Sequence, residues 1–187
     1  MSYRYEIRLS GSGGQGLILM GKVLAEAAAI YEDRNATQSQ SYGPEARGGA
    51  SKSEVIISDD EIDYPKATQL DLLLAFTQEA CDKYSPDLKP GGVFIVDSQF
   101  VKQIPEHSGQ LTSLPIHEIA GKEVGRTLMA NVLALGVIVA VSGIVQKDSV
   151  ESAVRARVPR GTEELNLKAF RAGYDAGRAS LPSPVGF

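Results

Sequence analysis

The stretch that decides the fold is residues 5–16. Residues 5–10, Tyr-Glu-Ile-Arg-Leu-Ser, alternate apolar and polar side chains, which predicts a β-strand. Residues 11–16, Gly-Ser-Gly-Gly-Gln-Gly, are too rich in glycine for regular structure. From Leu17 to about Ile30 apolar side chains recur with helical spacing. The chain is therefore expected to open as strand, glycine loop and helix.

The glycine loop has the composition of an anion-binding turn. Gly11, Gly13 and Gly16 match the pattern G-x-G-x-x-G, in which glycines permit a tight turn and the close approach of a ligand. Amide groups at the start of the following helix attract a phosphate or pyrophosphate. Gly14 and Gln15 complete the predicted binding loop. A tight turn that binds no ligand is the alternative.

Two common nucleotide sites fit the loop poorly. A nicotinamide or flavin dinucleotide site needs an acidic residue at the end of a second strand, about twenty residues further on. Glu32 and Asp33 lie at that distance, but they follow the helix directly and no apolar strand precedes them. A Walker P-loop fits still less, because Leu17 follows Gly16 and the loop has no Gly-Lys-Ser/Thr triplet.

The rest of the chain alternates strands with helices. Residues 32–53 are polar and carry no strand pattern, so we expect a long functional loop there. Strands are predicted at residues 54–58, 70–76, 93–96 and 111–116, with a turn at 86–92. Helices are predicted at residues 78–84, 127–145, from Asp148 (where Asp148 and Glu151 resemble a capping box) and 163–179. We expect a single three-layer α/β/α domain over residues 1–180, with a mostly parallel or mixed sheet and a loose tail at residues 181–187.

Composition excludes several classes of protein. The 187 residues are 43% apolar and 22% charged, as in a soluble globular domain. Nineteen basic residues against 23 acidic ones leave no positive surplus for nucleic acid. The single cysteine, Cys81, excludes an internal disulfide, a four-cysteine zinc site and an iron–sulfur cluster held by this chain alone. His107 and His117 lack partners at metal-ligand or catalytic spacing, so neither a metal site nor a catalytic residue is predicted.

Neither a membrane span nor a secretion signal is predicted. Residues 127–145 carry no charge and are just long enough to cross a bilayer. They include Asn131, Ser142 and two glycines, however, which favours a buried helix of the core. The first residues lack the basic and apolar regions of a signal peptide, so we expect a cytoplasmic protein.

A second loop carries the most specific pattern. Residues 41–49 are Ser-Tyr-Gly-Pro-Glu-Ala-Arg-Gly-Gly, where Arg47 stands beside two glycines. A guanidinium next to exposed amides suits an anion or a carboxylate, although Arg47 has Glu45 nearby as an alternative partner. Together with the glycine loop, this segment resembles the gamma subunits of the 2-oxoacid:ferredoxin oxidoreductases, and its sequence is most similar to the 2-oxoglutarate branch. Residues 125–131, Gly-Arg-Thr-Leu-Met-Ala-Asn, resemble a third stretch of that family.

The resemblance implies a subunit of an enzyme rather than a complete enzyme. Such complexes oxidatively decarboxylate a 2-oxoacid with coenzyme A to an acyl-CoA, carbon dioxide and reduced ferredoxin, or catalyse the reverse reaction. Thiamine diphosphate, Mg and [4Fe–4S] clusters would lie on alpha and beta subunits, and on a ferredoxin-like delta subunit where one is present. This gamma-type chain, similar to a catalytic-domain piece of the pyruvate/ketoisovalerate oxidoreductases, would help bind coenzyme A, cover the active site and be inactive alone.

The residues expected to contact coenzyme A come from all three stretches. They are Gly11, Gly13, Gly14, Gln15, Gly16, Tyr42, Arg47, Gly48, Gly49 and Asn131. Two alternatives remain at this point. One is a free-standing dinucleotide-dependent oxidoreductase that uses the glycine loop, and the other is a purely structural interaction subunit without a small ligand.

Overall fold

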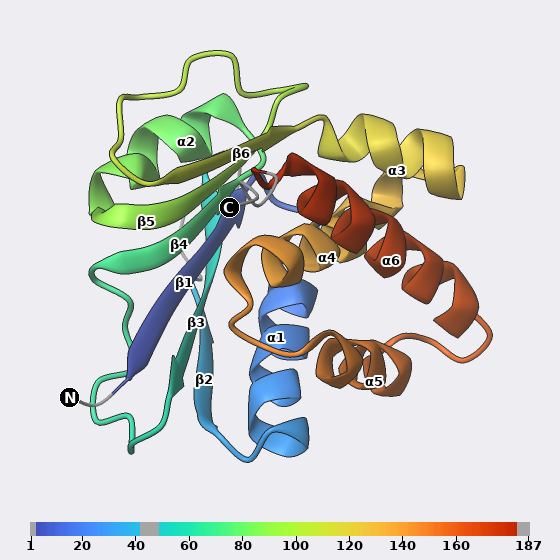
Figure 1. Cartoon of the computed structure of the whole chain (residues 1–187), viewed down its shortest axis with the longest axis horizontal. Helices are drawn as coiled ribbons and strands as arrows, with labels where there is room; N and C mark the ends of the chain where they lie inside the picture. Colours follow the sequence, from blue (N-terminus) through green and yellow to red (C-terminus); the bar gives the residue numbers. More distant parts are fainter. Residues whose placement is uncertain (1–2, 42–48, 183–187) are drawn as a thin grey trace, which may run out of the picture.

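The protein folds around a six-stranded mixed sheet (Figure 1). The computed structural model describes residues 3–41 and 49–182. The strands lie in the order β2-β3-β1-β4-β5-β6. Their bounds are β1 Arg4–Gly11, β2 Asn35–Gln40, β3 Ser51–Ser58, β4 Leu70–Ala75, β5 Leu88–Asp97 and β6 Gln110–Leu114. The helices are α1 Leu17–Tyr31, α2 Gln78–Tyr84, α3 Ile116–Val124, α4 Ala130–Ser142, α5 Lys147–Arg157 and α6 Glu163–Ser180, with short 3₁₀ turns at Ser85–Asp87 and Thr127–Met129.

Four neighbouring strands run in one direction. β1, β4, β5 and β6 are parallel, whereas β3 pairs antiparallel with β1 and β2 pairs antiparallel with β3. The carboxyl ends of the parallel strands therefore meet at one edge of the sheet. In open α/β sheets this edge is where ligands bind. The glycine loop, which follows β1, lies at this edge.

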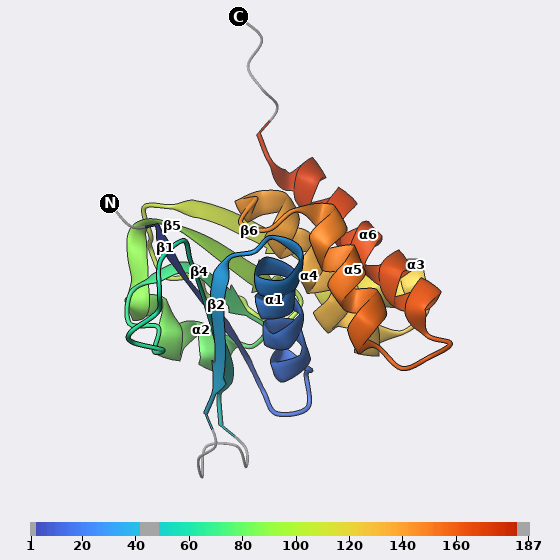
Figure 2. The same cartoon turned by 90° about the horizontal axis from the view of Figure 1, so that it is seen from below.

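Helices cover both faces of the sheet, as the sequence predicts (Figure 2). Ile7 and Leu9 of β1 belong to the larger apolar core, which α1, α3, α4, α5 and α6 help to build. On the other face, Leu73 of β4 and Phe94 of β5 pack with Ala80 and other side chains of α2. The predicted three-layer α/β/α architecture with a mixed sheet is confirmed.

The uncharged stretch at residues 127–145 lies in the core and is not one helix. A 3₁₀ turn occupies Thr127–Met129, and α4 ends before Gly143, whose φ of 61° is left-handed. From Ala130 to Val141 every residue of α4 is buried. Within the described ranges, no helix combines the length and the apolar character needed to cross a lipid bilayer.

Four expectations about local structure were wrong. Residues 35–40, expected in a loop, form the edge strand β2. Apart from Ala36 their side chains are polar, and all are at most half-buried, so pairing with β3 rather than apolar patterning makes the strand. The helix α3 was missed because only Ile116 and Ala120 of its nine residues are buried. The strand predicted at 93–96 begins at Leu88. Helix α5 begins one residue before Asp148 with Gln146 as its N-cap, so the capping box is absent there.

The contact between α4 and α6 depends on glycine. A Cβ built on Gly173 of α6 would lie 1.8 Å from the backbone oxygen of Leu133 in α4. A Cβ on Gly136 of α4 would lie 2.0 Å from the backbone oxygen of Phe170. The two helix backbones are therefore so close that no larger residue fits at either position without moving a helix.

Gly173→Ala should lower the free energy of unfolding by about 3 kcal/mol, because the added methyl group meets backbone that cannot rotate away. Urea denaturation of the full chain measures this. Gly121→Ala is the control: it also lies in a helix, but its Cβ would meet only Thr127 Cγ2 at 3.3 Å. This control should change stability by less than about 1 kcal/mol. Equal effects of the two substitutions would contradict the close approach of α4 and α6.

Candidate functional site

The glycine loop between β1 and α1 is held by two contacts that require glycine. Gln15 folds back, and its Oε1 accepts a hydrogen bond of 2.7 Å from the backbone N–H of Ser12. A Cβ on Gly11 would lie 2.2 Å from this same Oε1. Gly16 has a left-handed φ of 76°, and a Cβ there would lie 2.3 Å from Asn131 Nδ2. The loop therefore has one shape, which a side chain at either glycine would disturb.

The loop leaves the positive end of α1 open. Gly16 is the N-cap, and within the described part of the chain no side chain caps the helix. The first backbone N–H groups of a helix have no partner inside it, and together they carry a partial positive charge. The first turn of α1 holds no acidic residue that would neutralise that charge. This is an arrangement that can bind an anion.

Cavities lie on both sides of the glycine loop. The strand-side cavity, of about 400 Å³, is lined by residues 12–18 of the loop and α1 and by Gln40, Ser41, Ser51 and Lys52 of β2, β3 and the segments next to them. The helix-side cavity, of about 160 Å³, is lined by Gly14, Gln15, Gly16, His117, Thr127, Leu128, Ala130 and Asn131. The predicted residues Gly14, Gln15, Gly16 and Asn131 are thus brought together, and Gly13 joins them on the strand side.

His117 is a site residue that the sequence analysis missed. It lines the helix-side cavity, and its Nδ1 lies 2.5 Å from Oδ2 of Asp97, which is fully buried. Asp97 is the last residue of β5 and His117 is the second residue of α3, so the pair is twenty residues apart in the chain. A signal was present, because an aspartate at the carboxyl end of a parallel strand lies at the ligand-binding edge. The helix at residues 116–124 was not predicted, and so the pair was not found.

The remaining predicted residues lie mostly beyond what the structure describes. Tyr42, Arg47 and Gly48 fall outside the described residues. Gly49 is half-buried beside Ala50, just before β3 begins. The tail from residue 183 onward is likewise not described, so the predicted loose tail stays a prediction.

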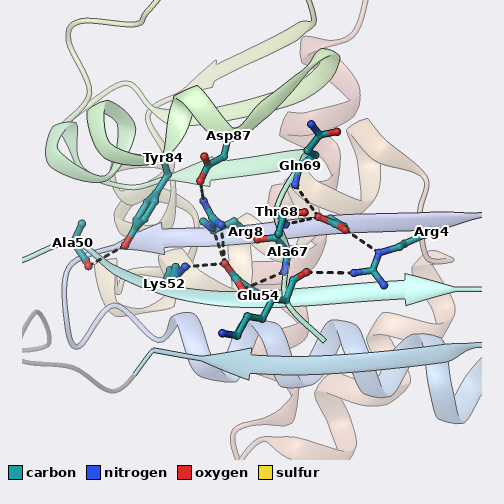
Figure 3. Close-up of polar contacts among 12 residues, drawn as sticks. Arg4, Arg8, Ala50, Lys52, Glu54, Ala67, Thr68, Gln69, Tyr84 and Asp87 are labelled. Atoms are coloured by element: carbon teal, nitrogen blue, oxygen red, sulfur yellow. Dashed lines mark hydrogen bonds and ion pairs between the residues drawn. The ribbon is translucent and has the colours of Figure 1, made fainter. Parts of the chain in front are cut away.

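The start of β3, which forms one wall of the strand-side cavity, is held by a buried ion network (Figure 3). Arg8 of β1 donates from Nε to Glu54 Oε1 at 2.9 Å, and its guanidinium also pairs with Asp87. Lys52 Nζ donates to the same Glu54 oxygen at 2.9 Å. Arg8 and Glu54 are 3% and 7% exposed. The network balances two positive against two negative charges beneath α2.

The aromatic ring of Tyr84 links this network to the segment before β3. The guanidinium of Arg8 lies 5.0 Å from the centre of the Tyr84 ring. The Tyr84 hydroxyl donates a hydrogen bond of 3.2 Å to the backbone oxygen of Ala50. The network therefore fixes Ala50 and Lys52, which bound the second loop.

A neighbouring carboxylate ties the segment before β4 to β1. Glu6 accepts hydrogen bonds from Arg4 Nε at 2.8 Å and from the backbone N–H groups of Thr68 and Gln69 at 2.7 and 3.0 Å (Figure 3). Burial favours the protonated form of Glu6, but these hydrogen bonds outweigh it and lower the pKa of the carboxyl group. The carboxylate therefore contributes stability at neutral pH that is lost as the pH falls through its lowered pKa.

The lone cysteine is a packing residue. Cys81 lies in α2 and is fully buried, with its Sγ 3.8 Å from the backbone oxygen of Gln103. Burial, aided by the charge of Asp82, raises the pKa of the thiol to about 11. Because the thiolate is the reactive form, this thiol is poorly reactive at neutral pH.

The geometry argues against a dinucleotide site at the glycine loop. Glu32, the acidic residue at the expected distance, is the C-cap of α1 and accepts a hydrogen bond of 2.6 Å from the backbone N–H of Gln146. The fifteen residues of α1, about 22 Å in length, separate it from the loop. The acid therefore lies at the wrong edge of the sheet to hold a ribose.

Arg8→Met should lower the free energy of unfolding by about 3–5 kcal/mol, because it leaves the buried Glu54 without its main partner. Urea denaturation measures this, and the double variant Arg8→Met/Glu54→Met should recover much of the loss. The control is Arg155→Met, which breaks an exposed pair with Glu164 and should cost less than about 1 kcal/mol. A loss in Arg8→Met no larger than in Arg155→Met would show that the network does not stabilise the fold.

Similarities to known proteins support the resemblance predicted from the loops. The family model of the pyruvate ferredoxin/flavodoxin oxidoreductases matches residues 6–176. The 2-oxoglutarate synthase subunit KorC of Methanocaldococcus jannaschii is 49% identical over 177 residues, which cover 94% of this chain and 95% of that protein. KorC of Archaeoglobus fulgidus is 42% identical and is matched over 90% of its length by 95% of this chain.

Solved structures agree with the fold. The gamma subunit of a keto/oxoacid ferredoxin oxidoreductase from Geobacter sulfurreducens is 56% identical, with a TM-score of 0.89 over 95% of this chain and 98% of that one. The 2-oxoglutarate:ferredoxin oxidoreductase of Magnetococcus marinus is 22% identical, with a TM-score of 0.84 over 97% of this chain and 32% of its own, which shows a shared fold. On the family match and these relatives, the chain belongs to the pyruvate ferredoxin/flavodoxin oxidoreductase family.

Proposed function

We propose that this chain is the gamma subunit of a 2-oxoglutarate:ferredoxin oxidoreductase. The complex converts 2-oxoglutarate, coenzyme A and oxidised ferredoxin to succinyl-CoA, carbon dioxide and reduced ferredoxin, or catalyses the reverse reaction. Relatives of matching length that are 2-oxoglutarate synthase subunits support this assignment, with identities of 42–49%. The chain works inside a hetero-oligomer, and alpha, beta and, where present, delta subunits hold thiamine diphosphate, Mg and the [4Fe–4S] clusters.

The part of the reaction assigned to this chain is the binding of coenzyme A. The observation that carries this assignment is the uncapped N-terminus of α1, which opens on the strand-side cavity of about 400 Å³. Among the described residues that line this cavity, Lys52 has the one charged side chain, and its Nζ, which is paired with Glu54, has further hydrogens to donate. Coenzyme A carries a pyrophosphate and a 3′-phosphate, which suit a site of helix amides and a cation. The related Magnetococcus marinus enzyme was solved with coenzyme A bound, which supports the same ligand here.

The glycine loop and the second loop divide the contacts between them. The amides of Gly13, Gly14, Gln15 and Gly16 face the pyrophosphate, and the packing at Gly11 keeps the loop in the required shape. In this proposal the second loop, with Tyr42, Arg47, Gly48 and Gly49, supplies the remaining contacts to the phosphates. The chain thereby binds and orients the coenzyme and shields the active site from water, while the partner subunits carry the carbon and electron chemistry.

Arg47→Ala in the assembled complex should raise the KM for coenzyme A roughly tenfold, the effect of losing one charge-assisted hydrogen bond. The KM for 2-oxoglutarate and the subunit composition on gel filtration should not change. Arg160→Ala, an exposed arginine between α5 and α6, is the control and should leave both KM values unchanged. An unchanged KM for coenzyme A in Arg47→Ala would contradict the phosphate role of this residue.

Calorimetry on the complex separates the proposal from its rivals. Coenzyme A should bind and NAD⁺ should not. Gly16→Ala should lower the affinity for coenzyme A more than tenfold, because the φ of residue 16 is left-handed and the Asn131 amide occupies the space that a Cβ would need. Binding of NAD⁺ instead would favour a dinucleotide-dependent oxidoreductase. If Gly16→Ala left the affinity for coenzyme A unchanged, the glycine loop would contribute to the subunit interface and not to the coenzyme A site.

A further inference from the structure

The helix-side cavity is lined by a largely buried polar side chain that lacks a hydrogen bond to the described residues. Asn131 lies in the first turn of α4, is 9% exposed and lines the cavity, and its side-chain amide makes no hydrogen bond to any described residue. The amide atoms keep some accessible surface, which they expose to the cavity. A ligand that accepts a hydrogen bond from Nδ2 would supply a partner.

The ends of two helices face the same cavity. Met129 is the N-cap of α4 and provides no side-chain cap, and Gly16 is the uncapped N-cap of α1. Asn131 and Gly16 are in direct packing contact, since a Cβ on Gly16 would meet the Asn131 amide. The positive end of α1 therefore lies against the Asn131 amide, whereas the N–H of Ala130 at the start of α4 is already bonded to the Thr127 oxygen. The charge of the α1 end favours a negatively charged group.

His117 forms the opposite wall, and its ring is locked. The backbone N–H of His117 donates to Asp97 Oδ2 at 3.0 Å, and Nδ1 lies 2.5 Å from the same oxygen. The ring is edge-to-face with Phe76 and with Phe100, with 5.1 Å between the ring centres in each case. Because Nδ1 is directed at a buried carboxylate, the other edge of the ring, which carries Nε2, is the part available to the cavity.

Charge assigns a role to this ring. Of the described residues lining the cavity, His117 is the one with a titratable side chain. Asp97 is the charged group in contact with the ring, while Phe76 and Phe100 supply uncharged neighbours from the other elements. When the ring is protonated, Nδ1–H donates to Asp97 and Nε2–H can donate to an anion in the cavity. The Asp97 carboxylate balances the positive charge of the ring.

We propose that the helix-side cavity is an oxyanion subsite in which Asn131 Nδ2 and His117 Nε2 are the side-chain donors and Asp97 is the positioning residue. The subsite extends the coenzyme A site across the glycine loop and rests on that proposed function. A volume of about 160 Å³ holds one phosphate or carboxylate group but not a whole coenzyme. The oxyanion is therefore either a phosphate of coenzyme A or the carboxylate of the 2-oxoacid.

The two histidines of the chain make a direct experiment possible. The full chain, labelled with ¹⁵N-histidine, is titrated with inorganic pyrophosphate, coenzyme A and 2-oxoglutarate, and both imidazoles are followed by NMR. His107 contacts Phe94 and lines neither cavity at the glycine loop, so it is the internal control. We expect the Nε2 signal of His117 to move to the range of a protonated nitrogen while His107 is unchanged.

The probes distinguish the source of the oxyanion. A response to pyrophosphate and coenzyme A assigns a phosphate, and a response to 2-oxoglutarate alone assigns a carboxylate. If His117 responds to none of the three, the subsite is overturned. In that case, a second, uniformly ¹⁵N-labelled sample is titrated with coenzyme A. Shifts of its Leu17 and Ile18 amides would leave the strand-side site intact, whereas their absence would overturn the coenzyme A site as well.

Matched variants test the two donors. Asn131→Asp keeps the size of the side chain and places a carboxylate in the first turn of α4, where the helix tolerates it, so the fold should persist. Asn131→Asp should lower the affinity for the probe that binds the wild type at least tenfold, because the ligand then faces a negative charge. Asp97→Asn should abolish the protonated Nε2 signal in the presence of the probe, an effect that a merely structural role would not produce.

The control for the ring is a substitution at the other histidine. His117→Gln should lower the affinity for the probe several-fold, and His107→Gln should leave that affinity unchanged. Wild-type affinity in both Asn131→Asp and His117→Gln would overturn the proposal.

Discussion

The contact between Gly16 and Asn131 is the constraint on which the candidate site depends. Gly16 has a left-handed backbone and no side chain, and the Asn131 amide fills the space that a Cβ would need. This contact joins the start of α1 to the start of α4, although the two residues are far apart in the sequence. Both helix N-termini consequently lie against one loop. A ligand at this edge meets the uncapped positive end of α1 and the side chains at the start of α4.

The polar side chains of β1 have a role that their pattern conceals. Alternation of apolar and polar residues usually means that one face of a strand is solvated. Here Glu6 and Arg8 are 6% and 3% exposed, because α2 and the segments around it cover that face. Their charges are compensated by Glu54, Arg4 and other partners. The cost of burying these groups is offset by contacts that fix the start of β3 and thus a wall of the strand-side cavity.

Much of the fold and part of the site could be predicted. Glycine spacing and the helix after it predicted the loop between β1 and α1, and Asn131 was selected because it ends the third stretch that resembles the family. His117 was dismissed because its partner, Asp97, is twenty residues away and becomes a neighbour only when β5 and β6 align. The strand β2 was not predicted for a related reason, because it is a strand through its hydrogen bonds to β3 and not through the pattern of its own side chains.

The sequence by itself determined the three-layer class of the fold, most of its strands and helices, the glycine loop after β1 and the family, because these follow from local backbone preference and from motif. It also determined that this chain alone cannot ligate an iron–sulfur cluster, since it has one cysteine. The tertiary structure decided which polar residues share a cavity and which are buried as ion pairs. Those outcomes depend on strand register and helix packing between distant segments, and no local pattern of residues records them.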